Sequence, residues 1–201
     1  MKESVLRRQM YLVYSVFMKK ILQKDQKLTL ISLKTKNLKK KQILSICKLK
    51  NSFWPWTIQK QLDWYKKTAR KTDINNMLLI NNRLVGYTLL RKRNAYENNK
   101  SFIYYYFDAF ILHKKFRNKG FGETLILFNN KILNKLKKHS FLTCTKKTIP
   151  FYSKYNWKIL PKNKFKIMDH KPAWFSGANS IKGMTYNLDR KVKKEIFYYF
   201  N

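Results

Sequence analysis

The sequence predicts a single α/β domain of the α+β kind, in which helices flank a mixed central sheet. Three observations support this class. The length of 201 residues suits one ordinary domain. Stretches in which apolar residues alternate are interleaved with stretches of helical spacing. Hydrophobic residues make up 44% of the chain, enough for one sizeable core despite the high charge. The expected order of elements is β-α-α-β-β-β-α-β-α-β-β.

The first third of the chain predicts a strand followed by two helices. Alternation over residues 27–34, KLTLISLK, predicts the strand. Asn37 is placed to cap a helix that continues to residue 49, and Pro55 suits the first turn of a second helix that ends near residue 70. In both helices apolar residues recur at spacings of three and four, which gives each helix one face for the core. These residues are Ile43, Ile46 and Cys47, and then Ile58, Leu62 and Tyr65.

A hairpin and a long buried strand come next. Residues 77–93 form two apolar runs around Asn81 and Asn82, which tolerate the positive φ angles of a tight turn. The run SFIYYYFDAFIL, residues 101–112, predicts a central strand that is buried on both faces. The remaining elements are a helix over 120–138, a strand over 141–145, a short helix over 149–155, strand pieces at 156–160 and 165–168, and a last strand over 183–188.

The ends of the chain differ from this central part. Residues 1–26 form an extension of uncertain structure, and residues 189–201 form a basic and aromatic tail. Arg7 and Arg8 precede a short apolar stretch, as in a signal peptide, but no small-residue cleavage site follows. We expect a peripheral helix there, or a leader upstream of a start at Met18, and a cytoplasmic protein. No apolar run approaches the roughly 20 residues that a membrane-spanning helix needs.

The charge is strongly positive, with 45 Lys and Arg residues against 10 Asp and Glu residues. Such a surface attracts polyanions, including nucleic acid and phosphorylated ligands. The richness in Lys and Asn also suggests an AT-rich genome, and the lysines are spread over the whole chain. We favour this second explanation for most of the charge. Two cysteines and three histidines without a CxxC pair predict neither a disulfide framework nor a metal site.

The segment most informative about chemistry is Arg117-x-x-Gly120-x-Gly122, which lies between the predicted central strand and an amphipathic helix. Glycine lets the backbone approach an anion closely, and the free N–H groups at a helix start favour negative charge. Arg117 and Lys119 add positive charge. Alone the pattern is weak, since a glycine-rich turn without a ligand would have the same sequence. It lacks the third glycine and the distal acid of a dinucleotide-binding turn and the GKS/T of a P-loop.

A second segment follows about 30 residues later, Phe151-Tyr152-Ser153-Lys154-Tyr155-Asn156-Trp157. Together the two segments resemble the coenzyme A motif and the FYxxxGF segment of the GNAT superfamily of N-acetyltransferases, over residues 27–188 of this chain. The expected order of elements resembles that of the superfamily too. Asn156 stands where the family usually has glycine, and asparagine tolerates left-handed backbone angles. Glu123 would repel a pyrophosphate, so we expect it to face away from the turn.

The resemblance implies acetyl-coenzyme A as the acyl donor and assigns residues to it. The backbone of Ile111 and Leu112 would pair with the pantetheine arm. The backbone N–H groups of the following turn would hold the pyrophosphate. The residues of that turn are Arg117, Asn118, Lys119, Gly120, Phe121 and Gly122.

Two residues are candidates for proton transfer. Tyr152 matches the tyrosine that often protonates the departing thiolate, and a phenol with a pKa near ~10 keeps its proton at neutral pH; the alternative is a packed aromatic. Asp108 is the only acid of the central strand, and strict alternation places it on the same face as Phe110 and Leu112. It would serve as the base, or it pairs with a basic neighbour or binds the substrate amine. Weaker candidates are Glu97, His113, Asp169 and His170.

The acceptor pocket of similar enzymes lies between the first two helices and the loop before the last strand. Aromatic residues that suit a sugar, an acyl chain or an aromatic amine are found in both regions, whereas Trp64 fits the core better. The pocket candidates are Trp54, Trp56, Trp174 and Phe175.

The sequence therefore predicts an acetyl-CoA-dependent N-acetyltransferase. Its partner would be a small-molecule amine such as an amino sugar, attacked directly in a ternary complex. Two alternatives remain: a basic nucleic-acid-binding module, for which the sequence shows no specific motif, and a catalytically silent acyl-CoA-binding domain. The sequence does not indicate an oligomeric state.

Overall fold

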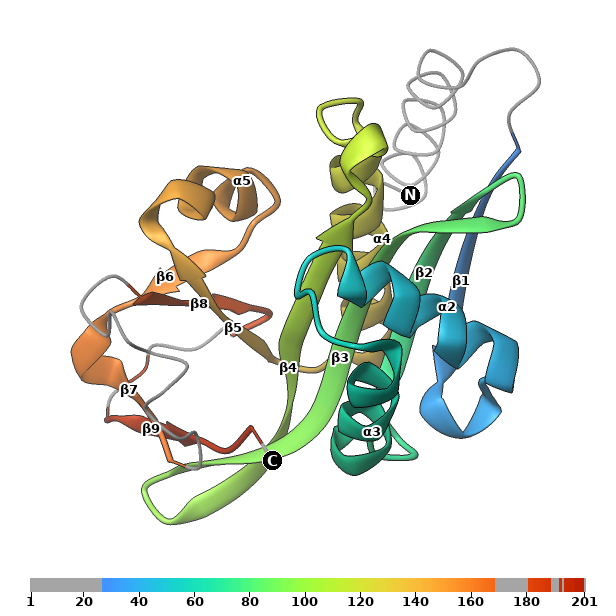
Figure 1. The fold of residues 1–201 in the computed structure, drawn as a ribbon. Helices are drawn as coiled ribbons and strands as arrows, with labels where there is room; N and C mark the ends of the chain where they lie inside the picture. Colours follow the sequence, from blue (N-terminus) through green and yellow to red (C-terminus); the bar gives the residue numbers. More distant parts are fainter. Residues whose placement is uncertain (1–26, 169–180, 189–191, 193, 201) are drawn as a thin grey trace.

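A computed structural model describes residues 27–168, 181–188, 192 and 194–200 (Figure 1). Trp174, Phe175, Asp169 and His170 lie outside these residues. The α-helices are α2 (Lys40–Asn51), α3 (Ile58–Thr68), α4 (Phe121–Leu136) and α5 (Ile149–Lys154). The strands are β1 (Leu28–Lys34), β2 (Ile74–Ile80), β3 (Arg83–Glu97), β4 (Lys100–Leu112), β5 (Ser140–Thr145), β6 (Lys158–Leu160), β7 (Phe165–Ile167), β8 (Ile181–Tyr186) and β9 (Ile196–Tyr198).

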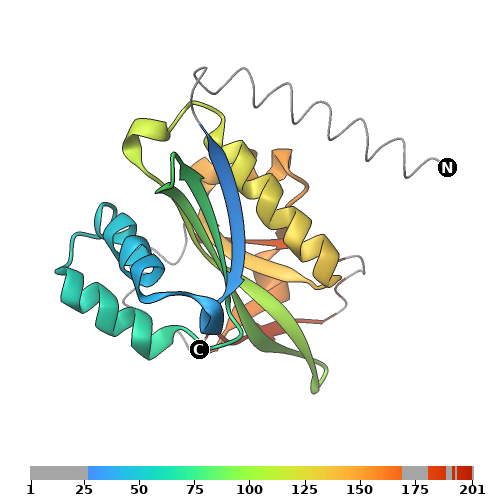
Figure 2. The ribbon, with the colours of Figure 1, turned by 90° about the vertical axis from the view of Figure 1, so that its right-hand side faces the viewer.

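The nine strands of the described residues belong to one mixed sheet. Its main path runs β1-β2-β3-β4-β5-β8-β6, and β9 joins β3 to β7. Among the pairs of these strands, only β4–β5 and β7–β9 are parallel. The helices α2 and α3 cover one face of the sheet and α4 covers the other, as Figure 2 shows. This arrangement confirms the predicted α+β class with a mixed sheet between helices.

The hairpin turns rely on asparagine pairs. Asn81 and Asn82 connect β2 to β3 with φ angles of 48° and 60°, as the sequence predicts. A second pair, Asn98 and Asn99, has φ angles of 52° and 60° between β3 and β4. The amide side chain of asparagine stabilises the left-handed region by local hydrogen bonds, so two consecutive asparagines can replace the usual Asn-Gly turn.

The starts of the first two helices differ from the prediction. Helix α2 begins after Lys39, whose backbone N–H donates to the side chain of Gln42 at 2.8 Å, whereas Asn37 lies in a short 3₁₀ turn. Helix α3 is capped by Thr57, which accepts a hydrogen bond from the N–H of Lys60 at 3.2 Å. Pro55 lies before this cap. In both cases a hydrogen bond between a backbone N–H and a side chain links the cap residue to the third residue of the helix and fixes where the helix starts.

Strand β4 contains a β-bulge at Asp108. Consecutive residues of β3 pair with Ala109 and Phe107, so Asp108 is an extra residue in β4. An extra residue reverses the alternation of side chains beyond it. Asp108 and Ala109 therefore both line the α2/α3 face, whereas Phe110 and Leu112 pack on the α4 face. The prediction that Asp108 shares a face with Phe110 and Leu112 is wrong for this reason.

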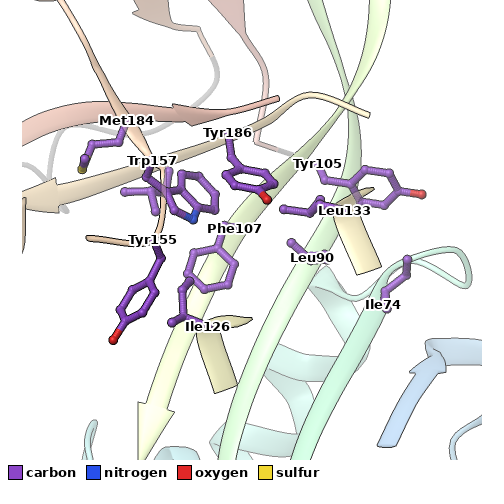
Figure 3. Close-up of a cluster of buried hydrophobic side chains, with 11 residues drawn as sticks. Ile74, Leu90, Tyr105, Phe107, Ile126, Leu133, Tyr155, Trp157, Met184 and Tyr186 are labelled. Atoms are coloured by element: carbon purple, nitrogen blue, oxygen red, sulfur yellow. The ribbon is translucent and has the colours of Figure 1, made fainter. Parts of the chain in front are cut away.

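The core on the α4 face contains the second of the two segments that carry the family resemblance. Trp157 is buried there among other apolar side chains (Figure 3). Its indole N–H donates to the side chain of Asn130 in α4 at 3.1 Å. Asn156 adopts a φ of 66°, which confirms that asparagine supports the turn in place of glycine. Gly183 of β8 leaves room for two rings, since a Cβ there would lie 2.7 Å from Phe165 and 2.9 Å from Phe141.

The end of the chain is part of the sheet. Strand β9 pairs with β3, and Phe200 is buried after it. The backbone carbonyl of Phe200 accepts a hydrogen bond from Arg93 at 2.8 Å, and Arg93 also forms a buried ion pair with Asp73 at 2.8 Å. The segment that the sequence suggests to be a tail thus contributes a strand, and its last aromatic side chain reaches the middle of the sheet.

Candidate active site

The strands β4 and β5 separate soon after they meet. They pair at only two positions, Tyr105 with Ser140 and Tyr106 with Phe141. Beyond these pairs the two strands diverge, with α5 following β5 and α4 following β4 (Figure 1). From Phe107 to Leu112, β4 pairs with β3 on one edge, and no described strand pairs with the other edge.

The pairing with β3 determines which backbone groups face this open edge. The N–H of His113 donates to the carbonyl of Val85 at 2.8 Å, so alternate residues of β4 back to Ala109 turn their polar backbone groups toward β3. Ile111 is one of these residues. Phe110 and Leu112 alternate with the residues that face β3, so their N–H and C=O groups face the open edge.

The turn that follows β4 brings a helix start close to this edge. Asn118 and Gly120 both adopt left-handed backbone angles, with φ of 57° and 76°. The N–H of Thr124 donates to the carbonyl of Gly120 at 3.1 Å, which is the first bond of the helix. The N–H groups of Phe121, Gly122 and Glu123 belong to the first turn of the helix and have no intrahelical acceptor. They give this end of α4 a partial positive charge that suits an anion.

Gly122 lies where α4, β4 and α5 come together. A Cβ at Gly122 would lie 3.8 Å from the ring of Phe110 and 3.9 Å from the ring of Phe151, which is ordinary contact. The carboxylate of Glu123 lies 3.8 Å from the ammonium of Lys154 in α5. Glu123 is thus directed toward another charge, as expected for an acid that must not repel an anion at the helix start.

The side chain of Arg117 connects the turn to its surroundings. Its Nε donates to the carbonyl of Leu112 at 3.2 Å, and its guanidinium lies 4.5 Å from the ring centre of Phe53. Arg117 thereby holds the end of β4 against the loop after α2. Of the two backbone groups of Leu112 at the open edge, the carbonyl is already hydrogen-bonded and the N–H remains.

Tyr152 lies in an aromatic cluster on the α4 face. Its ring is close to edge-on against Phe107 and Phe110, each at a centre-to-centre distance of 6.3 Å, and it also contacts Phe151 and Trp157. Burial raises the pKa of the Tyr152 phenol well above its ordinary value, and the neighbouring Cys144 adds to this. The phenol therefore keeps its proton at neutral pH.

A pocket of about 260 Å³ opens on the α2/α3 face beside the bulge. Two of the candidates from the sequence, Trp54 and Trp56, line this pocket and are 37% and 43% exposed. Trp64 also lines it, although the sequence favoured a core position for this residue. The other lining residues come from both helices, from β3, β4 and β5 and from the end of the chain: Lys50, Gln61, Thr68, Arg91, Tyr106, Asp108, Ala109, Thr143 and Phe200.

Asp108 forms an ion pair in this pocket. Its Oδ2 accepts a hydrogen bond from the Nε of Arg91 at 2.8 Å, and the two side chains are 23% and 5% exposed. The structure thus shows the basic neighbour that the sequence left as one alternative for Asp108. One carboxylate oxygen is committed to Arg91, and Oδ1 is the oxygen that can accept a bond from an amine.

The sequence analysis did not identify Lys50 and Phe200 as pocket residues. Lys50 follows Ile46 and Cys47 by four and three residues, so helical spacing already places it on the buried face of α2. That spacing was the available signal, since a lysine on an apolar face needs an explanation. Phe200 stacks on Tyr106 with ring centres 3.8 Å apart. No sequence signal indicates this contact, because 94 residues separate the two rings along the chain.

Residues 43–157 match the family model described as the acetyltransferase (GNAT) family. This span is more than half of the chain and includes the bulge, the turn at Gly120 and the segment that ends at Trp157. The chain therefore belongs to the GNAT family, and the predicted resemblance is confirmed. A search among curated proteins finds no match.

Solved structures share the fold. An acyl-CoA N-acyltransferase from Pseudomonas aeruginosa superimposes with a TM-score of 0.57 at 13% identity, covering 79% of this chain and 99% of that chain. ElaA from Escherichia coli gives a TM-score of 0.56 at 12% identity, with the same coverage. The aminoglycoside N-acetyltransferase AAC(6')-Iy, solved with CoA, gives 0.50 at 11% identity and covers 67% of this chain and 88% of that chain.

Among the residues that the structure describes, no helix is long and apolar enough to cross a membrane. No group of three or more His, Cys, Asp and Glu side chains within this part of the chain is arranged to hold a metal ion.

Proposed function

We propose that this chain is an N-acetyltransferase that transfers an acetyl group from acetyl-CoA to the amine of a small molecule, such as an amino sugar. The observation that carries the proposal is the open edge of β4, which leads directly into the left-handed turn and the start of α4. A strand edge offers hydrogen bonds to the amides of a pantetheine arm. The helix start offers N–H groups to a pyrophosphate at the end of that arm.

The donor would be held mainly by backbone groups. The alternation along β4 assigns the pairing with the pantetheine arm to Phe110 and Leu112 instead of Ile111 and Leu112. The N–H of Leu112 is the better group, since its carbonyl already accepts the bond from Arg117. The residues of the turn, 117–122, would surround the pyrophosphate with N–H groups, while Arg117 and Lys119 add positive charge.

The reaction would be a direct acyl transfer. The amine nitrogen attacks the thioester carbonyl, a C–N bond forms, the C–S bond breaks, and coenzyme A leaves as a thiolate. The amine must lose a proton and the thiolate must gain one. Tyr152 and Asp108 lie on opposite faces of β4, so a thioester at the open edge can be approached from both sides.

Tyr152 would act on the leaving group. Because its pKa is raised, the phenol is protonated and can donate a hydrogen bond to the thiolate. Complete proton transfer to a thiolate with a pKa near ~8.5 is uphill from such a phenol, so stabilisation of the thiolate by this bond is the main effect.

Asp108 would act on the acceptor. Its bond to Arg91 fixes the carboxylate at the floor of the pocket, and Oδ1 is placed to receive a hydrogen bond from the amine. This role is either to hold the ammonium or to accept its proton. Loss of the first role would act mainly on KM, and loss of the second would act on kcat.

The proposal can be tested with two measurements. Titration with acetyl-CoA by calorimetry should show saturable binding to one site, and release of free thiol should accelerate when an amine from a library is added. Binding without thiol release across the library would indicate a silent acyl-CoA-binding domain. Absence of acetyl-CoA binding would overturn the proposal.

The nucleic-acid alternative has a separate test because its binding would be electrostatic. If the positive charge mainly reflects genome composition, affinity for DNA or RNA should be weak, independent of sequence, and lost steeply with increasing salt. Tight binding to one sequence at physiological salt would favour a binding module instead.

A further inference from the structure

Lys50 is the least expected side chain of the acceptor pocket. The residue is only 6% exposed, and its ammonium lies 3.4 Å from the ring centre of Trp64 and 5.9 Å from that of Trp54. It lines the pocket beside the bulge. Throughout the part of the chain that the structure describes, no carboxylate lies within ion-pair distance of this ammonium.

The neighbouring charges do not neutralise it. Asp108 is bound to Arg91, so these two charges largely cancel, and among the described residues that line the pocket one positive charge remains, that of Lys50. Burial lowers the pKa of Lys50 to about 8, and the charge of Arg91 contributes in the same direction, whereas Asp108 and Cys47 act in the opposite direction. The ammonium has thus lost hydration without gaining a counter-ion, so an anion that enters the pocket would be stabilised there.

The rest of the pocket suits an apolar body. Trp54, Trp56 and Trp64 supply aromatic walls from α3 and the loop before it, and the stacked rings of Tyr106 and Phe200 supply another. A volume of about 260 Å³ admits a molecule of the size of an amino acid or a monosaccharide. Among the described residues of this lining, the charged groups are the ion pair of Asp108 with Arg91 and the ammonium of Lys50.

We propose that the acceptor carries a carboxylate in addition to its amine, and that Lys50 binds this carboxylate against the face of Trp64. The inference rests on the proposed acetyltransferase function and identifies the class of its acceptor. A monoanion matches the single positive charge of the pocket, whereas a doubly charged phosphate would leave excess negative charge in a half-buried site.

The arrangement also says what the pocket should reject. Oδ1 of Asp108 can still accept a hydrogen bond and Lys50 carries a positive charge, so an acceptor with one amine and one carboxylate can satisfy both groups. An acceptor with several amines and no acid would bring positive charge against Lys50, and that repulsion selects against it. Selection of this kind follows from the side chains of the pocket alone and does not depend on the donor.

The test compares acids with their neutral amides, in the absence of acetyl-CoA. The probes are N-acetylglycine, N-acetyl-leucine, N-acetylphenylalanine and N-acetyltryptophan, each paired with its primary amide, and they represent reaction products of graded apolar size. Calorimetry on the full chain at pH 7 should show at least one acid binding roughly tenfold or more tightly than its amide, the effect of one charge-assisted hydrogen bond. At pH 8, binding of that acid should also take up protons from the buffer, because the anion favours the charged form of Lys50.

Two variants assign the preference to Lys50. In Lys50→Met the stem is kept and the charge removed, so the preference for the acid should fall to less than about twofold. Lys48→Met removes an exposed lysine two residues away on the same helix and should leave the preference unchanged. The proposal is overturned if no acid binds more tightly than its amide, which includes the case in which no probe binds, or if the preference survives in Lys50→Met.

Failure of this inference is distinct from failure of the proposed function. The function is tested by titration with acetyl-CoA and by thiol release with amines of any charge. If acetyl-CoA binds and amines without a carboxylate are acetylated as well as those with one, the acetyltransferase assignment holds and the carboxylate assignment is wrong. If acetyl-CoA does not bind, the acid preference can still be measured because the probe experiment contains no donor.

Discussion

The two faces of β4 carry different kinds of candidate binding group, backbone groups on one face and side chains on the other. On the α4 face, the candidate donor site consists of backbone groups at the open edge and the helix start, surrounded by the rings of Phe110, Phe151 and Tyr152. On the α2/α3 face, the candidate acceptor pocket consists of charged and aromatic side chains. Backbone groups bind whatever has the shape and charge of the donor, whereas side chains distinguish one acceptor from another. The difference suggests that one donor chemistry is combined with an acceptor preference specific to this chain.

The largest effect is expected from a charge placed on the donor side. Gly122→Asp introduces a carboxylate at the start of α4, between Phe110 and Phe151, where a pyrophosphate would bind. Like charges repel there, so measurable acetyl-CoA binding should be abolished, as calorimetry can show. Binding of the acid probes in the acceptor pocket should be unchanged, because that pocket lies on the other face.

Gly122→Ala is the matched control for this variant. Its Cβ would meet both rings at ordinary contact distances, so the variant should fold and bind acetyl-CoA within a few-fold of the native chain. Gly120→Asp should also lose acetyl-CoA binding, but charge repulsion would not be the sole cause. The φ of 76° at this position also strains any residue with a Cβ. Unchanged acetyl-CoA affinity in a folded Gly122→Asp protein would show that acetyl-CoA does not bind at the start of α4.

Tyr152→Phe separates chemistry from binding on the same face. The ring contacts with Phe107 and Phe110 remain, so the free energy of unfolding and the affinity for acetyl-CoA should barely change. If the phenol stabilises the departing thiolate, the rate of the chemical step should fall by roughly 10²–10³-fold, the usual effect of removing one hydrogen-bond donor from developing negative charge. Because the phenol stays protonated, this loss should be similar from pH 6 to pH 9.

Single-turnover measurements would show the effect of this substitution most directly. They report the chemical step even when product release limits steady-state turnover. Undiminished single-turnover rates in Tyr152→Phe would leave Tyr152 as a packing residue of the aromatic cluster.

Asp108→Asn tests the acceptor side. Asparagine can still accept the bond from Arg91, but it removes the negative charge that faces the amine. If Asp108 holds the acceptor's ammonium, kcat/KM should fall by about 10–10²-fold, mostly through KM, since a hydrogen bond to a charged group contributes about 1.5–3 kcal/mol. If Asp108 is the base, the loss should appear in kcat. Unchanged kinetics for every amine would assign Asp108 only the ion pair with Arg91.

The difference between the two faces also explains what the sequence could predict. The turn at Gly120 and the segment at Asn156 require residues that tolerate left-handed angles, and such requirements are visible as Gly and Asn at fixed spacing. Alternation and helical spacing gave most elements of the sheet and its helices for the same local reasons.

The acceptor side depends on contacts between distant residues. The bulge at Asp108 reverses the faces of β4, and nothing in SFIYYYFDAFIL indicates where an extra residue is inserted. The sequence did not predict strand β9, because this strand depends on a long-range pairing with β3. That pairing joins Ala95 to Tyr198, across 103 residues. Lys50 could have been found from its position on the apolar face of α2, but its approach to the ring of Trp64, over which Arg91 also lies, requires the folded chain.

The smallest expected effect is on the free energy of unfolding, which burial of the charged Lys50 in the acceptor pocket should lower. Lys50 has a pKa of about 8 in the folded protein against an ordinary value of 10.5, so the folded protein disfavours its charged form. Below pH 8 the lysine is charged in both states and the full cost of burial is present; as the pH rises from 8 to 10.5 the cost disappears. Lys50→Met should therefore stabilise the protein at pH 7.

The size of this gain follows from two opposing effects. A difference of about 2.5 pKa units corresponds to about 3 kcal/mol, and loss of the contact with the face of Trp64 offsets about 1–2 kcal/mol. We expect a net gain of about 1–2 kcal/mol, or roughly 2–8 °C in Tm, measured by calorimetry at pH 7 and shrinking toward pH 10. Exposed Lys48→Met should change stability by less than about 0.5 kcal/mol at either pH. A Lys50→Met protein that is less stable than the native chain at pH 7 would mean that the ammonium stabilises the fold. The acceptor pocket would then contain no unmatched charge for a carboxylate to neutralise.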